Sequence, residues 1–117
     1  ILGLPIVINQ NVFFDYLYIN DLVRIIDIFI KKPPKEKFIN VGTGRRIDLL
    51  TIAKTINTFV EKKSEIIVKN IKLQNEYTCD IKRLKKEVGD FKFTDFVISL
   101  KELYSYYKSI KSSLVLD

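Results

Sequence analysis

The sequence predicts an α/β fold with a small mixed sheet and helices packed against it. Short runs of β-branched and aromatic residues alternate with helix-length amphipathic segments. No repeat, low-complexity tract or linker interrupts this alternation over the 117 residues. We therefore expect a single domain over residues 1–117, with a frayed tail at residues 111–117.

Four segments have the composition of strands. A turn at residues 9–11 separates the first from the second, and a polar loop follows the last from residue 70 to residue 76. Helices between the later strands favour parallel pairing, whereas the short gap between the first two leaves room for a local antiparallel pair. The expected strands are residues 6–8, 12–19, 37–41 and 65–69.

Four helices are expected where apolar residues recur with a helical period. Two breakers set helix ends: Pro33 ends the first helix, and Gly89 takes the left-handed position that ends the third. The residues predicted to cap or begin the four helices are Asp21, Asp48, Asp80 and Thr94.

The chain is basic, with 20 Lys and Arg against 14 Asp and Glu and a formal net charge of +6. Such a surplus attracts nucleic acid, an acidic membrane face or a phosphorylated small molecule. Sixteen of the basic residues are scattered Lys, and only four are Arg, the side chain that forks onto guanine or phosphate. This composition favours a solvated Lys-rich surface, and we do not expect nucleic acid to be the partner.

The chemical inventory excludes several site classes. The chain has no His and one Cys, Cys79, so a Ser-His-Asp site, a Cys-His site and an intrachain disulfide are impossible. We expect no transition metal, because carboxylates alone suit such metals poorly. No apolar stretch is long enough to cross a bilayer, and the first ten residues lack signal-peptide features. With its lone thiol, the chain is expected in the cytoplasm.

The Gly42-Thr43-Gly44 turn raises the question of phosphate binding. The third glycine of a dinucleotide fingerprint is missing, because Ile47 stands three residues beyond Gly44. No cofactor is therefore expected at this turn. Arg45 and Arg46 leave a looser anion site as a candidate, beside the alternative that the glycines only permit unusual backbone angles.

Three segments carry a family resemblance. Residues 15–22, Asp-Tyr-Leu-Tyr-Ile-Asn-Asp-Leu, are similar to a motif Asp-aromatic-aliphatic-Tyr-Val-Asp-Asp-Leu. Residues 40–44, Asn-Val-Gly-Thr-Gly, with Leu49, Leu50 and Ala53, resemble the glycine turn and the helix that follows it. Residues 80–84, Asp-Ile-Lys-Arg-Leu, with Val88-Gly89 resemble a late Asp-x-x-Lys/Arg-Leu and Leu-Gly segment. In this order they resemble the C-terminal substrate-binding part of NAD-dependent sugar-nucleotide epimerases and dehydratases, of the extended short-chain dehydrogenase/reductase type.

The resemblance implies a function for the parent enzyme and a smaller one for this chain. An N-terminal Rossmann domain, absent here, would bind NAD or NADP and supply the catalytic residues. This chain would bind the nucleotide-diphosphate sugar without catalysis of its own. It has no Met and opens with Ile1, so we expect that something preceded it. Whether the parent is an epimerase, dehydratase or reductase stays open.

The resemblance also directs attention to particular side chains. Phe14 stands where many members carry an Arg that grips the diphosphate, and a second expected Arg is missing. The substrate-binding candidates are then Asn11, Lys69 and Lys72, the two Lys as less directional substitutes for Arg. Tyr104 and Lys108 have the spacing of a short-chain dehydrogenase catalytic pair, but about one such pair is expected by chance. No catalytic residue is assigned.

Two other functions stay open on the sequence. One is a small basic α/β module that binds nucleic acid, and the other is a structural remnant that binds nothing. Separation from a partner domain would expose an apolar surface, so self-association is expected.

Overall fold

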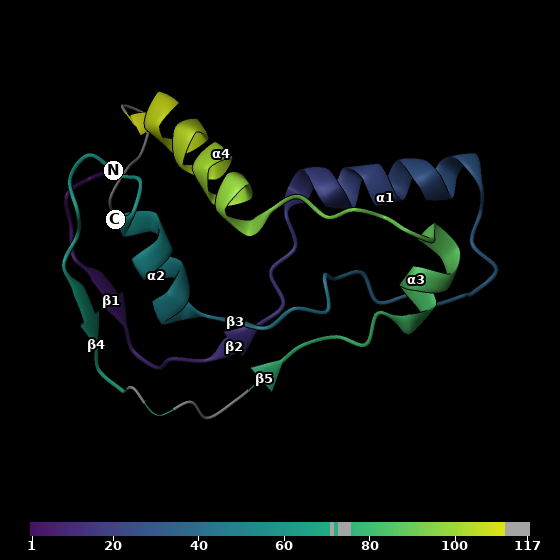
Figure 1. Ribbon diagram of the computed structural model, residues 1–117, viewed down its shortest axis with the longest axis horizontal. Helices are drawn as coiled ribbons and strands as arrows, with labels where there is room; N and C mark the ends of the chain where they lie inside the picture. The colour runs from purple at the N-terminus through teal and green to yellow at the C-terminus, as the bar shows by residue number, and fades with distance from the viewer. Residues whose placement is uncertain (71, 73–75, 112–117) are drawn as a thin grey trace. The chain divides into compact units, whose positions relative to one another are not determined.

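The computed structural model describes residues 1–70, 72 and 76–111 and divides the chain into two compact units (Figure 1). Residues 112–117 of the tail predicted at 111–117, and residues 71 and 73–75 of the predicted loop, lie outside the described residues. The first unit comprises Ile1–Asn11, Leu49–Leu73 and Asp95–Asp117, and the second comprises Val12–Asp48 and Gln74–Thr94. Within the described residues, the α/β class is confirmed: four helices accompany two small sheets.

The first unit contains a parallel pair of strands. Strand β1 (Ile6–Ile8) pairs with β4 (Ile66–Val68), and Ile6 lies opposite Ile66. Helix α2 (Leu49–Asn57) packs on both strands and on α4 (Phe96–Ser109). The parallel pairing follows the sequence prediction, because a long crossover separates the two strands.

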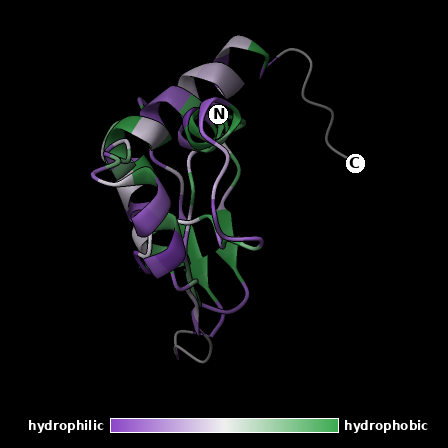
Figure 2. Cartoon of the chain, turned by 90° about the vertical axis from the view of Figure 1, so that its right-hand side faces the viewer, coloured by the Kyte–Doolittle hydropathy of each residue, from purple (hydrophilic) through white to green (hydrophobic). Residues whose placement is uncertain are grey.

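The second unit contains a three-stranded mixed sheet. Strand β2 (Phe13–Phe14) is central, antiparallel to β3 (Ile47–Asp48) and parallel to β5 (Glu76–Tyr77). Helices α1 (Ile19–Lys31) and α3 (Lys82–Val88) complete the unit. Its buried core consists of Ile25, Ile81 and Leu84. Hydrophobic and hydrophilic residues alternate along the helices, as expected for helices that bury one side (Figure 2).

Two strand predictions are wrong in extent or pairing. Only Phe13 and Phe14 of the segment 12–19 form a strand, and the segment 37–41 forms none. Ile39 and Val41 pack against the core of the second unit without strand pairing, so their alternation reflects burial alone. The first two strands lie in different sheets, so the antiparallel pair expected between them is replaced by β2 with β3.

The starts of α1 and α4 differ from prediction. Asp21 lies inside α1, whose N-cap is Tyr18. Asp48 pairs in β3 and stands directly before Leu49, the first residue of α2, at the predicted start of that helix. The N-cap of α4 is Asp95, which accepts hydrogen bonds from the Val97 and Ile98 backbone N–H groups, and not Thr94.

The third helix ends at the predicted Gly89, but its N-cap is Ile81, one residue after the predicted Asp80. The Asp80 carboxylate accepts a hydrogen bond from the Lys82 N–H at 2.8 Å, which satisfies a free donor of the first turn. Gly89 ends the helix with a φ of 62°, and its N–H donates to the Lys85 carbonyl. A residue with a side chain resists that backbone angle.

Candidate functional site

The glycine turn of the second unit is closed around the carboxylate of Asp15. This carboxylate accepts hydrogen bonds from the Thr43 N–H at 2.9 Å, the Thr43 hydroxyl at 2.5 Å and the Gly44 N–H at 2.8 Å. The Cys79 thiol donates to it at 3.5 Å. An internal anion therefore occupies the donors that a glycine turn offers to a phosphate.

Burial and hydrogen bonds shift the pKa values of Asp15 and Cys79 in opposite directions. Burial raises the pKa of Asp15, but the bonds from Thr43, Gly44 and Cys79 outweigh it, and the pKa lies below its ordinary value. Burial, followed by the hydrogen bond to Asp15 and its charge, raises the pKa of the Cys79 thiol. Cys79 is consequently a protonated donor rather than a reactive thiolate.

Gly42 and Gly44 are required by this packing. A Cβ on Gly42 would clash with the Cys79 sulfur and lie 2.6 Å from a carboxylate oxygen of Asp15. Gly44 has a φ of 71°, and a Cβ there would lie 2.8 Å from the Ile81 side chain. The turn does not fit a dinucleotide, because its N–H groups serve Asp15 and its glycines serve close packing.

The two arginines predicted as an anion site have different surroundings. Arg46 is 3.2 Å from a carboxylate oxygen of Glu76, and its guanidinium lies over the Phe13 ring at 5.3 Å. Arg45 is exposed and has no ion pair within the part of the chain that the structure describes. Its backbone N–H donates to the Thr43 hydroxyl oxygen at 3.1 Å. Arg45 is thus the arginine of this pair that is available to a ligand.

Arg45 lies at the edge of a cleft of about 810 Å³ in the second unit. We call this the α3 cleft. Its apolar lining residues, which we call the floor, include Leu84 and Phe91, and Lys85 and Lys92 add two more cations to the lining. Asp90 is the carboxylate in the lining. Such a combination suits a ligand that has both negative charge and an apolar ring.

The substrate-binding candidates Asn11, Lys69 and Lys72 belong to the first unit. Asn11 is 3% exposed, and its side-chain oxygen accepts a hydrogen bond from the Leu50 N–H at 3.1 Å, in the first turn of α2. This arrangement gives Asn11 a capping role that the sequence did not reveal, because the helix lies 38 residues further on.

Both lysine candidates have exposed side chains and structured backbones. The Lys69 N–H donates to the Ile8 carbonyl at 2.9 Å and continues the pairing of β4 with β1. The Lys72 carbonyl accepts a hydrogen bond from the Gln10 side chain, and its N–H donates to Asn70. No described cleft joins these lysines to Asn11.

Tyr104 and Lys108 have structural contacts in the first unit. The Lys108 ammonium is 2.6 Å from a carboxylate oxygen of Glu61, and the Tyr104 ring meets Phe59 edge to face at 5.8 Å. The hydrogen bond and charge of Glu61 raise the pKa of Lys108. A raised pKa makes Lys108 a poorer proton acceptor at neutral pH, contrary to what proton relay by this pair needs.

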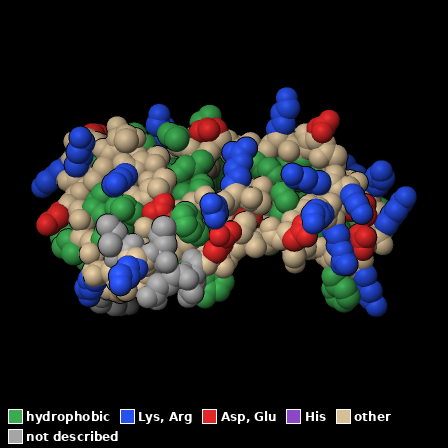
Figure 3. All heavy atoms as spheres, turned by 60° about the horizontal axis from the view of Figure 1, so that its bottom comes forward, with side chains coloured by type: hydrophobic (Ala, Val, Ile, Leu, Met, Phe, Trp, Pro, Cys, Tyr) green, Lys and Arg blue, Asp and Glu red, His purple; other side chains and the backbone are tan. Residues whose placement is uncertain are grey.

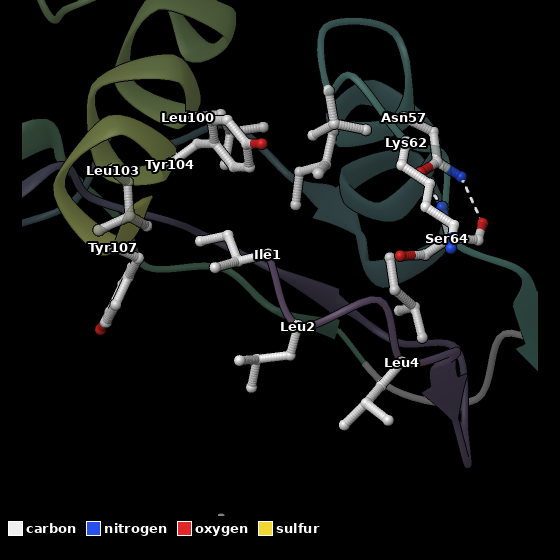
Figure 4. A pocket seen from close by; sticks show the side chains of 13 residues that line it. Ile1, Leu2, Leu4, Asn57, Lys62, Ser64, Leu100, Leu103, Tyr104 and Tyr107 are labelled. Atoms are coloured by element: carbon white, nitrogen blue, oxygen red, sulfur yellow. Dashed lines mark hydrogen bonds between the residues drawn. The ribbon is translucent and has the colours of Figure 1, made fainter. Parts of the chain in front are cut away.

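The first unit has an apolar pocket of about 330 Å³ (Figure 4). The N-terminal residues Leu2 and Leu4 and the α4 residues Leu103 and Tyr107 are among those that line it, and Ile1 lies between the two groups. A hydrogen-bonded pair, Asn57 with Ser64, lies at one side. The pocket has a single cation, Lys62, and therefore suits a charged ligand less well than the α3 cleft.

Charge on the surface is dispersed. On the face drawn in Figure 3, Lys and Arg side chains are spread widely and Asp and Glu lie among them. Within the described ranges, no group of three or more Cys, Asp and Glu side chains is placed to hold a metal ion. No helix among those same residues has the length and apolar character of a membrane span.

Lys85, Lys92 and Phe91 were not among the sequence-based site candidates. No motif or spacing in the sequence sets Lys85 and Lys92 apart from the other lysines. Arg45 and Lys85 are also forty positions apart in the chain. Only the packing of the Gly44 turn against Ile81 brings them to one cleft.

Comparison with known proteins adds no relative. No protein-family model matches the chain, and no curated protein matches it.

Proposed function

We propose that this chain is the nucleotide-diphosphate-sugar-binding part of an NAD(P)-dependent epimerase, dehydratase or reductase, and that it has no catalytic activity of its own. In this proposal it is a C-terminal subdomain of an extended short-chain dehydrogenase/reductase in the cytoplasm, where Cys79 stays reduced. NAD or NADP would be bound by the Rossmann part of the parent.

The observation that carries the proposal is the convergence of the three family-like segments. Asp15 of the first segment binds the Thr43 and Gly44 turn of the second, and Gly44 packs against Ile81 of the third. Ile25, in the helix that follows the first segment, shares the buried core with Ile81 and Leu84. Motif residues that depend on one another in space support a common architecture more strongly than three separate matches in a sequence.

An exposed apolar stripe on α1 also supports the proposal. Ile19, Val23, Ile26 and Ile30 follow one another at spacings of four, three and four, and each is between 47% and 75% exposed. The opposite side of the same helix is already buried through Ile25. A helix with apolar residues on two sides is typical of one that packs between two bodies. A further domain of the parent is the partner that the proposal implies.

Binding experiments on the purified chain test the proposal. Saturation-transfer NMR with UDP-glucose, dTDP-glucose and GDP-mannose should detect weak binding of at least one sugar nucleotide. NAD and NADH should give no transfer, and no sugar should turn over. The coding sequence ahead of Ile1 should contain, in frame, a strand followed by a glycine-rich dinucleotide motif.

A salt series separates this proposal from nucleic-acid binding. An oligonucleotide bound through phosphates loses affinity steeply as salt rises, because bound counterions are released on association. Arg24, Arg46 and Arg83 each lie within 4 Å of a carboxylate oxygen, which reduces the charge free for such contacts. Salt-sensitive oligonucleotide binding in the absence of any sugar-nucleotide binding would contradict the proposal.

A further inference from the structure

We propose that the α3 cleft binds the diphosphate of the nucleotide sugar through Arg45, Lys85 and Lys92, with the ring system of the nucleotide against the apolar floor. This inference rests on the proposed function and moves its binding site from the lysines of the first unit to the second unit. The ligand class follows from the lining, which combines three cations with one carboxylate, Asp90, above Leu84 and Phe91.

The cations of the cleft are free to meet a ligand. Within the described ranges, Arg45, Lys85 and Lys92 have no ion pair, and all three are exposed. By contrast, Arg46 and Arg83 each lie near a Glu. An unpaired guanidinium can form two parallel hydrogen bonds to phosphate oxygens, and the two ammonium groups add charge without that directionality.

The backbone of Arg45 is held in place before any ligand binds. Asp15 fixes Thr43 through two hydrogen bonds, and the Thr43 hydroxyl oxygen then accepts the Arg45 N–H. Gly44 turns the chain against Ile81 of the cleft. The glycine turn therefore acts as the support for Arg45 rather than as the phosphate site itself, and a fixed support lowers the entropy cost of binding.

The opposite side of the cleft is fixed through Arg24. Its guanidinium donates to the Lys92 carbonyl at 3.2 Å and lies 4.5 Å from the centre of the Phe91 ring. The rings of Phe91 and Phe93 meet edge to face at 4.9 Å. These contacts hold the segment that carries Lys92. Lys85 lies in α3, where its backbone is hydrogen-bonded to Ile81 and Gly89, so all three cations project from supported backbone.

The test is an NMR titration of the ¹⁵N-labelled chain with UDP-glucose, UDP and inorganic pyrophosphate. UDP-glucose should shift the amide resonances of residues 43–45 and 85–93. Arg45→Ala and Lys92→Ala should each weaken UDP-glucose binding about fivefold, the loss expected for one charge-assisted contact in a partly solvated site. Arg46→Ala and Lys86→Ala are the matched controls, since both remove a neighbouring cation outside the cleft lining.

The possible outcomes distinguish failure of the cleft assignment from failure of the proposed function. If UDP-glucose binds but shifts residues 69–72, or if Arg45→Ala and Arg46→Ala weaken it equally, the cleft assignment is overturned and the proposed function stands. If pyrophosphate shifts the cleft while no sugar nucleotide binds anywhere on the chain, the ligand assignment and the proposed function both fail. Preserved dispersion of the amide spectrum checks that each variant is folded.

Discussion

Asp21 and Asp27 offer a sharp test of how the second unit is held together. Both lie on α1, and each pairs with a cation one turn further on: Asp21 with Arg24 at 2.9 Å and Asp27 with Lys31 at 2.6 Å. The Asp21 side chain is 1% exposed, whereas that of Asp27 is 56% exposed. We expect replacement of Asp21 to destabilise the chain far more than replacement of Asp27.

The magnitude follows from the contacts of the Asp21 carboxylate. Besides Arg24, it accepts hydrogen bonds from the Thr94 N–H at 2.9 Å and the Thr94 hydroxyl at 2.8 Å. Asp21→Ala leaves the two Thr94 donors without this acceptor, while Arg24 can turn to water. Each hydrogen bond to a charged group contributes about 1.5–3 kcal/mol, so we expect a loss of about 3–4 kcal/mol. For Asp27→Ala we expect less than about 0.5 kcal/mol.

Urea unfolding followed by circular dichroism measures both losses as shifts of the midpoint at constant slope. Thr94→Val removes the hydroxyl contact but keeps the backbone donor, and should lower the free energy of unfolding by about 1.5–3 kcal/mol. In the double variant, the effects of Asp21→Ala and Thr94→Val should not add, because they share a contact. If Asp21→Ala does not fold, Asp21→Asn serves in its place. Equal losses at Asp21 and Asp27 would refute the reasoning.

Three further predictions concern the glycine turn and the surface of α1. Because folding lowers the pKa of Asp15, its stabilisation is complete above the ordinary value of 3.8 and is lost as the pH falls through the lower folded value; urea midpoints of Asp15→Asn should lack this acid-dependent part. Gly42→Ala should destabilise by about 2 kcal/mol in the same assay, and Cys79→Ala should recover part of the loss by removing one clashing atom. The wild-type chain should self-associate in analytical ultracentrifugation through the exposed apolar stripe of α1. The double variant Ile26→Lys, Ile30→Lys should be monomeric at little cost in stability, because both side chains are exposed. A wild-type chain that stays monomeric at high concentration would contradict the stripe as a contact surface.

Periodicity was sufficient to predict the class of the fold and most of its helices. The strand at 6–8 and the strand within 65–69 have β-branched residues, and each is present where the pattern indicated it. The segment 37–41 has a similar pattern but no strand partner, since Ile39 and Val41 are used only for burial. Alternation of apolar and polar residues indicates which side chains face a core. It does not indicate which other segment of backbone pairs with that segment.

Capping was harder to predict, because an acidic residue before an apolar helix has the same local sequence whatever its carboxylate binds. Asp21 binds Thr94, 73 residues away, while Asn11 caps a helix that begins at Leu49. Asp95 caps its own helix, as local reasoning allows, but the neighbouring Thr94 was the equally good local choice. Long-range partners decided the roles of Asp21 and Asn11.

The sequence indicated one of the three cations of the candidate site. Arg45 follows a glycine turn and was predicted to be near an anion, but Lys85 and Lys92 join it only because the turn packs on α3. The sequence did not indicate that the N–H groups of the turn donate to the carboxylate of Asp15, because that partner lies 28 residues before Thr43.

The residues that carry the family resemblance are chiefly those that hold the second unit together. Asp15 closes the glycine turn, Gly44 allows that turn to pack on Ile81, and Asp21 ties α1 to Thr94. None of these groups is free for a ligand, because each is already engaged within the protein. The motif residues are therefore needed for the fold of the second unit, and in the proposed function the ligand would be chosen by other residues that this fold presents. Arg45 is the clearest of these, because the same carboxylate that closes the turn also fixes the backbone from which Arg45 projects.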